Sequence, residues 1–126
     1  MLTGRMTVDK LREVVVEIMD PNVCGHDDSY GGDFDKNVML CAGYYHGGKD
    51  SCSGDSGGAL QCRVPGGRWK LTGIVSFGDI CGMARRPGVY TRVAKLIDWI
   101  KKYIQRTHIH SGVGRGGAPG AGAPPR

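Results

Sequence analysis

The sequence has no apolar run long enough to cross a membrane, and residues 1–6 lack the apolar core of a signal peptide. It has no Cys-x-x-Cys pair and no histidine at ligand spacing from a cysteine, which excludes the common zinc sites. It also has no motif typical of RNA- or DNA-binding domains. The net charge of +5 therefore indicates a solvated basic face, with a surface for acidic glycans or nucleic acid as the alternative.

The composition is that of a globular protein from an oxidising compartment. The 126 residues, 40% hydrophobic and 23% charged, are enough for one domain. Five cysteines in a small glycine-rich chain predict disulfide bonds. Because five is an odd number, at least one cysteine has no partner within the chain.

The chain is organised around residues 49–58, KDSCSGDSGG, which contain three glycines, three serines, two aspartates and one cysteine. So few side chains that can build a core predict a loop on a scaffold formed elsewhere. Gly54, Gly57 and Gly58 permit φ above zero and close approach of the backbone. We interpret Ser56 as a hydroxyl that faces open space, beside two amides, those of Gly54 and Ser56, aimed as in an oxyanion hole. The alternative is a surface turn.

Residues 50–58 resemble the nucleophile segment of the chymotrypsin–trypsin family of serine proteases, and the resemblance extends from about residue 11 to residue 104. It implies that Ser56 is the nucleophile that forms an acyl-enzyme, and that Gly54 and Ser56 provide the oxyanion-hole amides. It also implies that Asp55 pairs with the ammonium group of a newly formed N-terminus.

The resemblance further implies a specificity pocket with Asp50 at its floor. Gly78 and Gly88 leave space on opposite walls, so a substrate Arg or Lys can enter and pair with the buried carboxylate. The alternative is a capped surface aspartate. The implied substrate-binding residues are Asp50, Ser51, Ser53, Ser76, Phe77, Gly78 and Gly88.

Three residues depart from the family's pattern. Phe77 stands where tryptophan is more common and still forms one wall of the pocket. Ile80 replaces a usual glycine before Cys81, and because β-branched residues resist φ above zero, the lip of the pocket is expected to be reshaped. Ala59 replaces proline, with a small expected effect on loop stiffness.

The family's cysteine pattern implies the disulfides Cys24–Cys41 and Cys52–Cys81. It leaves Cys62 unpaired, because the family's partner for this cysteine lies upstream of the residues present. The same resemblance implies a secreted or extracellular protein, or one held in secretory granules.

The implied fold class is all-β with a C-terminal helix, an incomplete second β-barrel of the trypsin-like double-barrel fold. Composition and periodicity predict strands at 11–19 and 38–43, a hairpin at 59–64 and 69–75, and a helix at 93–104. About four strands cannot close a six-stranded barrel, so exposed apolar faces are expected. The predicted organisation is a loose segment at 1–10, a partial protease domain at 11–105 and a disordered Gly/Ala/Pro-rich tail at 106–126.

Several aspartates and histidines could be metal ligands, but their spacing in the sequence does not predict a metal site. Residues 25–36 predict a surface loop, and their aspartates do not have the spacing of an EF-hand calcium site. His108 and His110 leave a weak metal site as an alternative. His46, the histidine nearest to Ser56 in the sequence, is interpreted as a surface-loop residue. The prediction is no metal and no cofactor.

The family's catalytic histidine lies in an Ala-Ala-His-Cys setting and its orienting aspartate in an Asp-Ile-Ala-Leu setting, and neither occurs here. We therefore expect a fragment of a trypsin-like serine endopeptidase, cleaving after Arg or Lys, that is inactive alone because Ser56 lacks a base. The expected partners are Arg- or Lys-containing substrates, serine protease inhibitors and the missing N-terminal half, and neither nucleic acid nor a membrane. The alternative is an inert truncated isoform that acts as a binding or decoy fragment.

Overall fold

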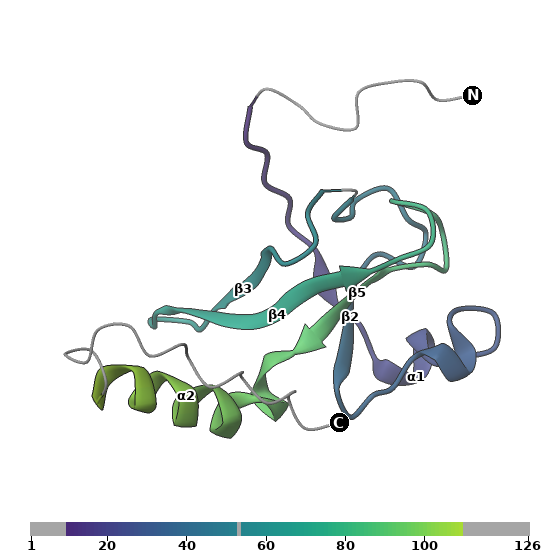
Figure 1. Cartoon of the computed structure of the whole chain (residues 1–126). Helices are drawn as coiled ribbons and strands as arrows, with labels where there is room; N and C mark the ends of the chain where they lie inside the picture. The colour runs from purple at the N-terminus through teal and green to yellow at the C-terminus, as the bar shows by residue number, and fades with distance from the viewer. Residues whose placement is uncertain (1–9, 53, 110–126) are drawn as a thin grey trace.

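A computed structural model of the chain describes residues 10–52 and 54–109. Its strands form one curled antiparallel sheet of five strands in the order β1-β2-β5-β4-β3, so the predicted all-β class with a C-terminal helix is confirmed (Figure 1). In Figure 1 the β3–β4 hairpin and helix α2 extend to the left, and helix α1 lies at the right. The elements are β1 Glu17–Ile18, α1 Pro21–Cys24, the 3-10 turn η1 Gly31–Asp33, β2 Met39–Gly43, β3 Ala59–Arg63, β4 Trp69–Phe77, β5 Gly88–Arg92, the 3-10 turn η2 Val93–Lys95 and α2 Ile97–Ile109.

The predicted hairpin forms from local turn chemistry. Strands β3 and β4 pair from Ala59 opposite Ile74 to Arg63 opposite Trp69. The turn between them contains Gly66 at φ +69°, a conformation that residues other than glycine rarely adopt. The hairpin thus brings β4, the longest strand, alongside the loop that contains Ser56.

The buried core is small and lies between the α1–η1 segment and strands β2 and β5. The disulfide pair Cys24 and Cys41 clusters there with Tyr30, Phe34 and Val89. The prediction of a surface loop at 25–36 is therefore wrong for its two aromatic side chains, which turn inward and remove apolar area from water.

The strand predicted at 11–19 is largely absent. Only β1 forms there, with Glu17 opposite Gly43 and Ile18 opposite Ala42. Leu11 is fully exposed. β-Branched residues favour a strand only where another strand offers its hydrogen-bonding groups, and residues 11–16 have no such neighbour in the part of the chain that the structure describes.

The C-terminal helix also differs from its predicted bounds. Residues 93–95 form a 3-10 turn, and α2 begins at Ile97 and continues to Ile109, beyond the predicted domain end at residue 105. Residues 106–109, predicted as the start of the tail, are helical. Residues 1–9 and 110–126, which include most of the predicted loose segment and tail and also His110, lie outside the described residues.

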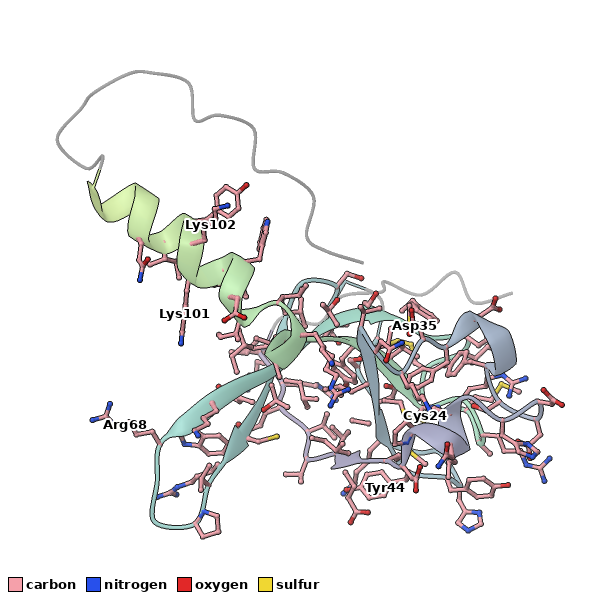
Figure 2. All side chains as sticks on the ribbon, turned by 90° about the horizontal axis from the view of Figure 1, so that it is seen from below. Cys24, Asp35, Tyr44, Arg68, Lys101 and Lys102 are labelled. Atoms are coloured by element: carbon pink, nitrogen blue, oxygen red, sulfur yellow. A yellow bond between two sulfur atoms is a disulfide. The ribbon has the colours of Figure 1, made fainter. Side chains whose placement is uncertain are left out.

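The surface combines apolar and basic side chains. On β4, Trp69 is 60% and Leu71 is 51% exposed, which agrees with a sheet that does not close into a barrel. Figure 2 shows Arg68 at the tip of the β3–β4 hairpin, while Lys101 and Lys102 project from α2. In the described part of the chain, no helix is long and apolar enough to cross a membrane.

All five cysteines lie in the described residues, and Cys62 on β3 is the free one, partly buried. A chromogenic disulfide reagent is expected to titrate one thiol per oxidised native chain and none in Cys62→Ser. A native monomer with no reactive thiol, or one in which Cys62→Ser still titrates, would mean that the cysteines pair differently.

Candidate active site

Hydrogen bonds within residues 52–58 fold the predicted nucleophile segment into consecutive tight turns. The Asp55 amide donates to the Cys52 carbonyl at 2.9 Å, and the Gly58 amide donates to the Asp55 carbonyl at 2.8 Å. Gly57 adopts φ +84°, and a Cβ on Gly58 would lie 2.8 Å from the Asp55 carbonyl oxygen. Larger residues at these two positions would therefore disrupt the turns.

Two connections attach this loop to the sheet. The Gly57 amide donates to the Val75 carbonyl and the Val75 amide donates to the Gly58 carbonyl, both at 2.9 Å, so two loop residues lie opposite one residue of β4, as in a β-bulge. On the other side, the disulfide Cys52–Cys81 joins the loop to the segment that follows β4. Both disulfides are the pairs that the family's pattern implies.

Ser56 lies on a cavity of about 260 Å³ together with most of the predicted substrate-binding residues. The cavity is lined by Asp50, Ser51, Cys52, Ser56, Val75, Ser76, Phe77, Gly78, Asp79, Cys81 and Gly88. The predicted residue Ser53 lies outside the described residues. Val75 and Asp79 were not predicted, because the sequence shows which residues form β4 but not which of them face the loop.

Asp50 is partly buried, and its two carboxylate oxygens are in different environments. Oδ2 accepts a hydrogen bond from the Gly82 amide at 3.2 Å. Oδ1 is buried and has no hydrogen-bond partner among the described residues. Burial raises the pKa of Asp50 above its ordinary 3.8, although hydrogen bonds from Gly82 and Ser51 oppose the rise. An ionised carboxylate with an unsatisfied oxygen favours a cationic ligand or a hydrogen-bond donor.

Gly88 leaves the space that Asp50 occupies. A Cβ at position 88 would lie 2.6 Å from Asp50 Oδ1, closer than two such atoms can approach. The Tyr90 hydroxyl donates to Ser51 Oγ at 3.3 Å, next to Asp50. Burial raises the pKa of Tyr90, so this phenol remains a neutral donor.

The amides of Gly54 and Ser56 donate no hydrogen bond within residues 10–52 and 54–109. The Asp55 carboxylate, predicted to pair with an N-terminal ammonium, accepts from the Cys52 amide at 2.7 Å. This side-chain acceptor links the two ends of the turn between Cys52 and Asp55 and so stabilises the turn. Sequence reasoning missed this contact, because aspartate in a turn more often accepts from an amide that follows it, and here the amide lies three residues before it.

Neither His26 nor His46, the two histidines whose side chains the structure describes, hydrogen-bonds to Ser56. His26 contacts Asp28 at 2.8 Å, and His46 packs edge-on against Tyr45. Within the same residues, no group of three metal-binding side chains lies together. The described residues therefore place the Ser56 hydroxyl and the Asp50 carboxylate on one cavity, and neither His26 nor His46 contacts that hydroxyl.

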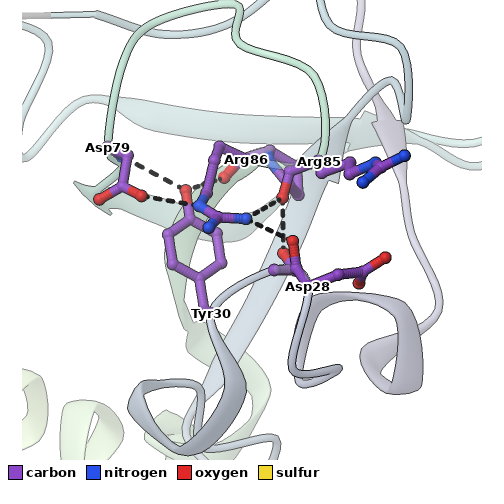
Figure 3. Close-up of polar contacts among 7 residues, drawn as sticks. Asp28, Tyr30, Asp79, Arg85 and Arg86 are labelled. Carbon is purple, nitrogen blue, oxygen red and sulfur yellow. Dashed lines mark hydrogen bonds and ion pairs between the residues drawn. The ribbon is translucent and has the colours of Figure 1, made fainter.

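Ile80, expected to resist positive φ and so to reshape the lip of the cavity, does not adopt a positive φ. Among the described residues other than glycine, only Arg85 has a positive φ, +61°. The turn between the cavity walls thus takes its unusual conformation at Arg85. Figure 3 shows Arg85 among polar contacts that also include Tyr30, Asp79 and Arg86.

Comparisons with known proteins agree with this geometry. The family model described as Trypsin matches residues 2–100. The chain is 50% identical over 94 residues to "Hepatocyte growth factor activator serine proteases" of Canis lupus familiaris, which covers 75% of this chain and 14% of that protein. It is 52% identical over 90 residues to "Transmembrane protease serine 9" of Rattus norvegicus, which covers 71% of this chain and 8% of that protein.

A third relative, "Hepatocyte growth factor activator serine protease" of Homo sapiens, is 47% identical over 95 residues, covering 75% of this chain and 14% of that protein. The chain therefore spans only a small part of the length of these relatives. The curled sheet of five antiparallel strands followed by a helix is consistent with an incomplete trypsin-like barrel. The chain belongs to the trypsin family of serine proteases.

Proposed function

We propose that this chain forms the nucleophile and specificity-pocket part of a serine endopeptidase that cleaves after Arg or Lys. The observation that carries the proposal is the unsatisfied Oδ1 of Asp50, buried on the same cavity as Ser56. A guanidinium or ammonium group supplies both the charge and the donors that this oxygen lacks. An apolar substrate side chain would leave the carboxylate unsatisfied and would bind poorly.

In the proposed reaction, Ser56 Oγ forms an ester with the carbonyl carbon of the substrate while the bond to the leaving amine breaks. The hydroxyl proton passes through a base to that amine, and water later cleaves the ester. The amides of Gly54 and Ser56, which donate to no acceptor in the described residues, supply the donors for the negative oxygen of the intermediate. In this proposal Asp55 holds their loop in place.

The base is proposed to come from the N-terminal half of the protease domain, because Ser56 has no histidine partner in the described residues. The further partners proposed are protein or peptide substrates and serine protease inhibitors. The two disulfides favour an extracellular or secretory-granule location.

The isolated 126-residue chain is expected not to react with a fluorophosphonate probe, because an unactivated serine hydroxyl is a weak nucleophile. The measurement compares the chain with Ser56→Ala by mass spectrometry. Labelling that disappears in Ser56→Ala would show an activated serine and contradict the proposed origin of the base.

The pocket is tested by binding of benzamidine, a planar aryl amidinium, to the chain. Replacing Asp50 by serine is expected to weaken binding about tenfold or more, since the charge-assisted hydrogen bonds are lost. Asp98→Asn removes the same charge from helix α2, away from the cavity lining, and is expected to bind like the wild type. Equal affinities in all three proteins would remove Asp50 from the pocket.

The raised pKa of Asp50 predicts opposite effects of pH on binding and on stability. Benzamidine binding is expected to be lost as the pH falls through this pKa, which lies above 3.8, because the protonated carboxyl has no charge. The folded chain holds the proton more tightly than the unfolded chain. Its stability therefore falls as the pH rises from 3.8 through the raised value, and the loss persists at pH 7.

Asp50→Asn is accordingly expected to raise the free energy of unfolding at pH 7, because burying a neutral amide costs less free energy than burying an ionised carboxylate. The gain is expected to vanish below the ordinary pKa, where the wild-type carboxyl is protonated in both states. Urea unfolding at the two pH values measures the difference, with Asp98→Asn as the control. A less stable Asp50→Asn at pH 7 would contradict the inferred cost of burial.

A further inference from the structure

Polar contacts join the two walls of the cavity to a segment far from them in the sequence (Figure 3). The first wall is residues 76–79, and the second wall is Gly88 with the residues that lead into it, 85–87, which lie behind the cavity lining. The third segment is residues 28–30, which we call the rim segment. The rim segment contains none of the site residues predicted from the sequence. The guanidinium group of Arg86 makes two of the rim segment's contacts with the walls, one to the Asp28 carbonyl and one to the Tyr30 ring.

Arg86 is partly buried and holds three groups at once. Its Nε donates to Asp79 Oδ2 at 2.7 Å, and its Nη1 donates to the Asp28 carbonyl at 2.6 Å. Its guanidinium carbon lies 5.8 Å from the centre of the Tyr30 ring. The planar guanidinium group of an arginine can contact a carboxylate, a carbonyl and an aromatic ring at the same time, whereas the compact ammonium group of a lysine cannot.

Tyr30, over which Arg86 lies, connects the two walls directly. Its hydroxyl donates to the Pro87 carbonyl at 2.6 Å and accepts from the Asp79 amide at 3.4 Å. The pairing of β4 with β5 ends at Phe77 opposite Val89. The Tyr30 hydroxyl therefore joins the segment that follows β4 to the segment that precedes β5, just beyond their last paired residues. The separation of the cavity walls at this point depends on the position of the Tyr30 ring.

The turn that carries Arg86 is itself held in an unfavourable conformation. Arg85 adopts φ +61°, which residues with a Cβ rarely do. Its amide donates to the Tyr45 carbonyl at 2.9 Å, and its carbonyl accepts from Ser29 Oγ at 2.8 Å. Such a conformation persists where the surroundings fix it from several sides, and here the rim segment supplies one of those contacts.

We propose that Arg86 is a positioning residue for the specificity pocket, an inference that rests on the proposed function. Arg86 does not line the cavity, and it acts through Asp79 and Tyr30. It holds the rim segment against both walls and so fixes their separation. It also neutralises Asp79 at the cavity surface, which leaves Asp50 as the carboxylate that selects the cation.

The test compares the affinities of two cations of different shape in Arg86→Gln. Benzamidine needs both walls at a set separation because its aryl ring is planar, whereas n-butylammonium adapts to altered walls. The ratio of their dissociation constants is expected to shift about tenfold against benzamidine. General loss of structure would weaken both ligands together and would not change this ratio.

Arg92→Gln is the matched control. Arg92 Nη1 donates to the Lys36 carbonyl at 3.1 Å, so this variant also removes an arginine–carbonyl bond over a similar span of sequence, but away from the cavity. It is expected to leave the ratio unchanged. The inference is overturned if Arg86→Gln and Arg92→Gln give the same ratio while the wild type binds benzamidine. Should Arg86→Gln not fold, Asp79→Asn breaks the same ion pair, with a shift in the same direction expected.

If the wild type binds neither cation, the proposed function fails, and the role of Arg86 is tested without a ligand. The Asp79 amide donates to the Tyr30 hydroxyl, so its hydrogen exchange reports whether the walls are held together. Exchange about tenfold faster in Arg86→Gln than in Arg92→Gln is expected. Equal exchange rates in the two variants would overturn the positioning role.

Discussion

The candidate pocket depends on one carboxylate oxygen that the fold removes from water without a partner. Asp50 Oδ1 is buried and has no hydrogen-bond partner among the described residues, and the missing side chain of Gly88 leaves the space that it occupies. The Gly82 amide holds the other oxygen and so fixes the direction of the group. Burial costs stability, and the same burial makes a cationic ligand favourable. Stability and ligand selection therefore oppose each other at Asp50, which explains why so many neighbouring constraints are needed to keep it in place.

The parts of the site with local chemistry could be predicted from the sequence. Glycines marked the turns of residues 52–58 and of the β3–β4 hairpin, and the family's pattern implied both disulfides that the structure contains. The contacts of Tyr30 and Arg86 could not be predicted, because they join groups 57 and 58 residues apart. Two aromatic residues in a polar segment, Tyr30 and Phe34, were the available signal, and the sequence does not show that both rings are buried. The short length of β1 could not be predicted either, because the strand propensity of residues 11–16 does not reveal whether a partner strand lies beside them.

The distribution of apolar side chains explains why so small a core accompanies so extended a sheet. The buried cluster lies beside α1, whereas Trp69 and Leu71 on β4 remain largely exposed. A sheet that closes into a barrel buries its inner face against itself, and five strands of this length leave that face open. The disulfide Cys24–Cys41 reinforces the side that already has a core, and the hairpin relies on its own pairing. The two ends of the sheet are thus stabilised by different means.

Strand β4 links the proposed chemistry to the proposed selectivity. Val75 pairs with the loop that contains Ser56, and two residues later Phe77 forms the wall of the cavity. Between them the β4–β5 register shifts, so one residue of β4 has no partner and the strand changes direction. The strand therefore supports the loop that contains Ser56 on one side of this irregularity and the cavity wall at Phe77 on the other. A shift in the pairing of β4 would move one of them relative to the other, so the position of Ser56 beside the wall depends on this strand as well as on the residues of the motif.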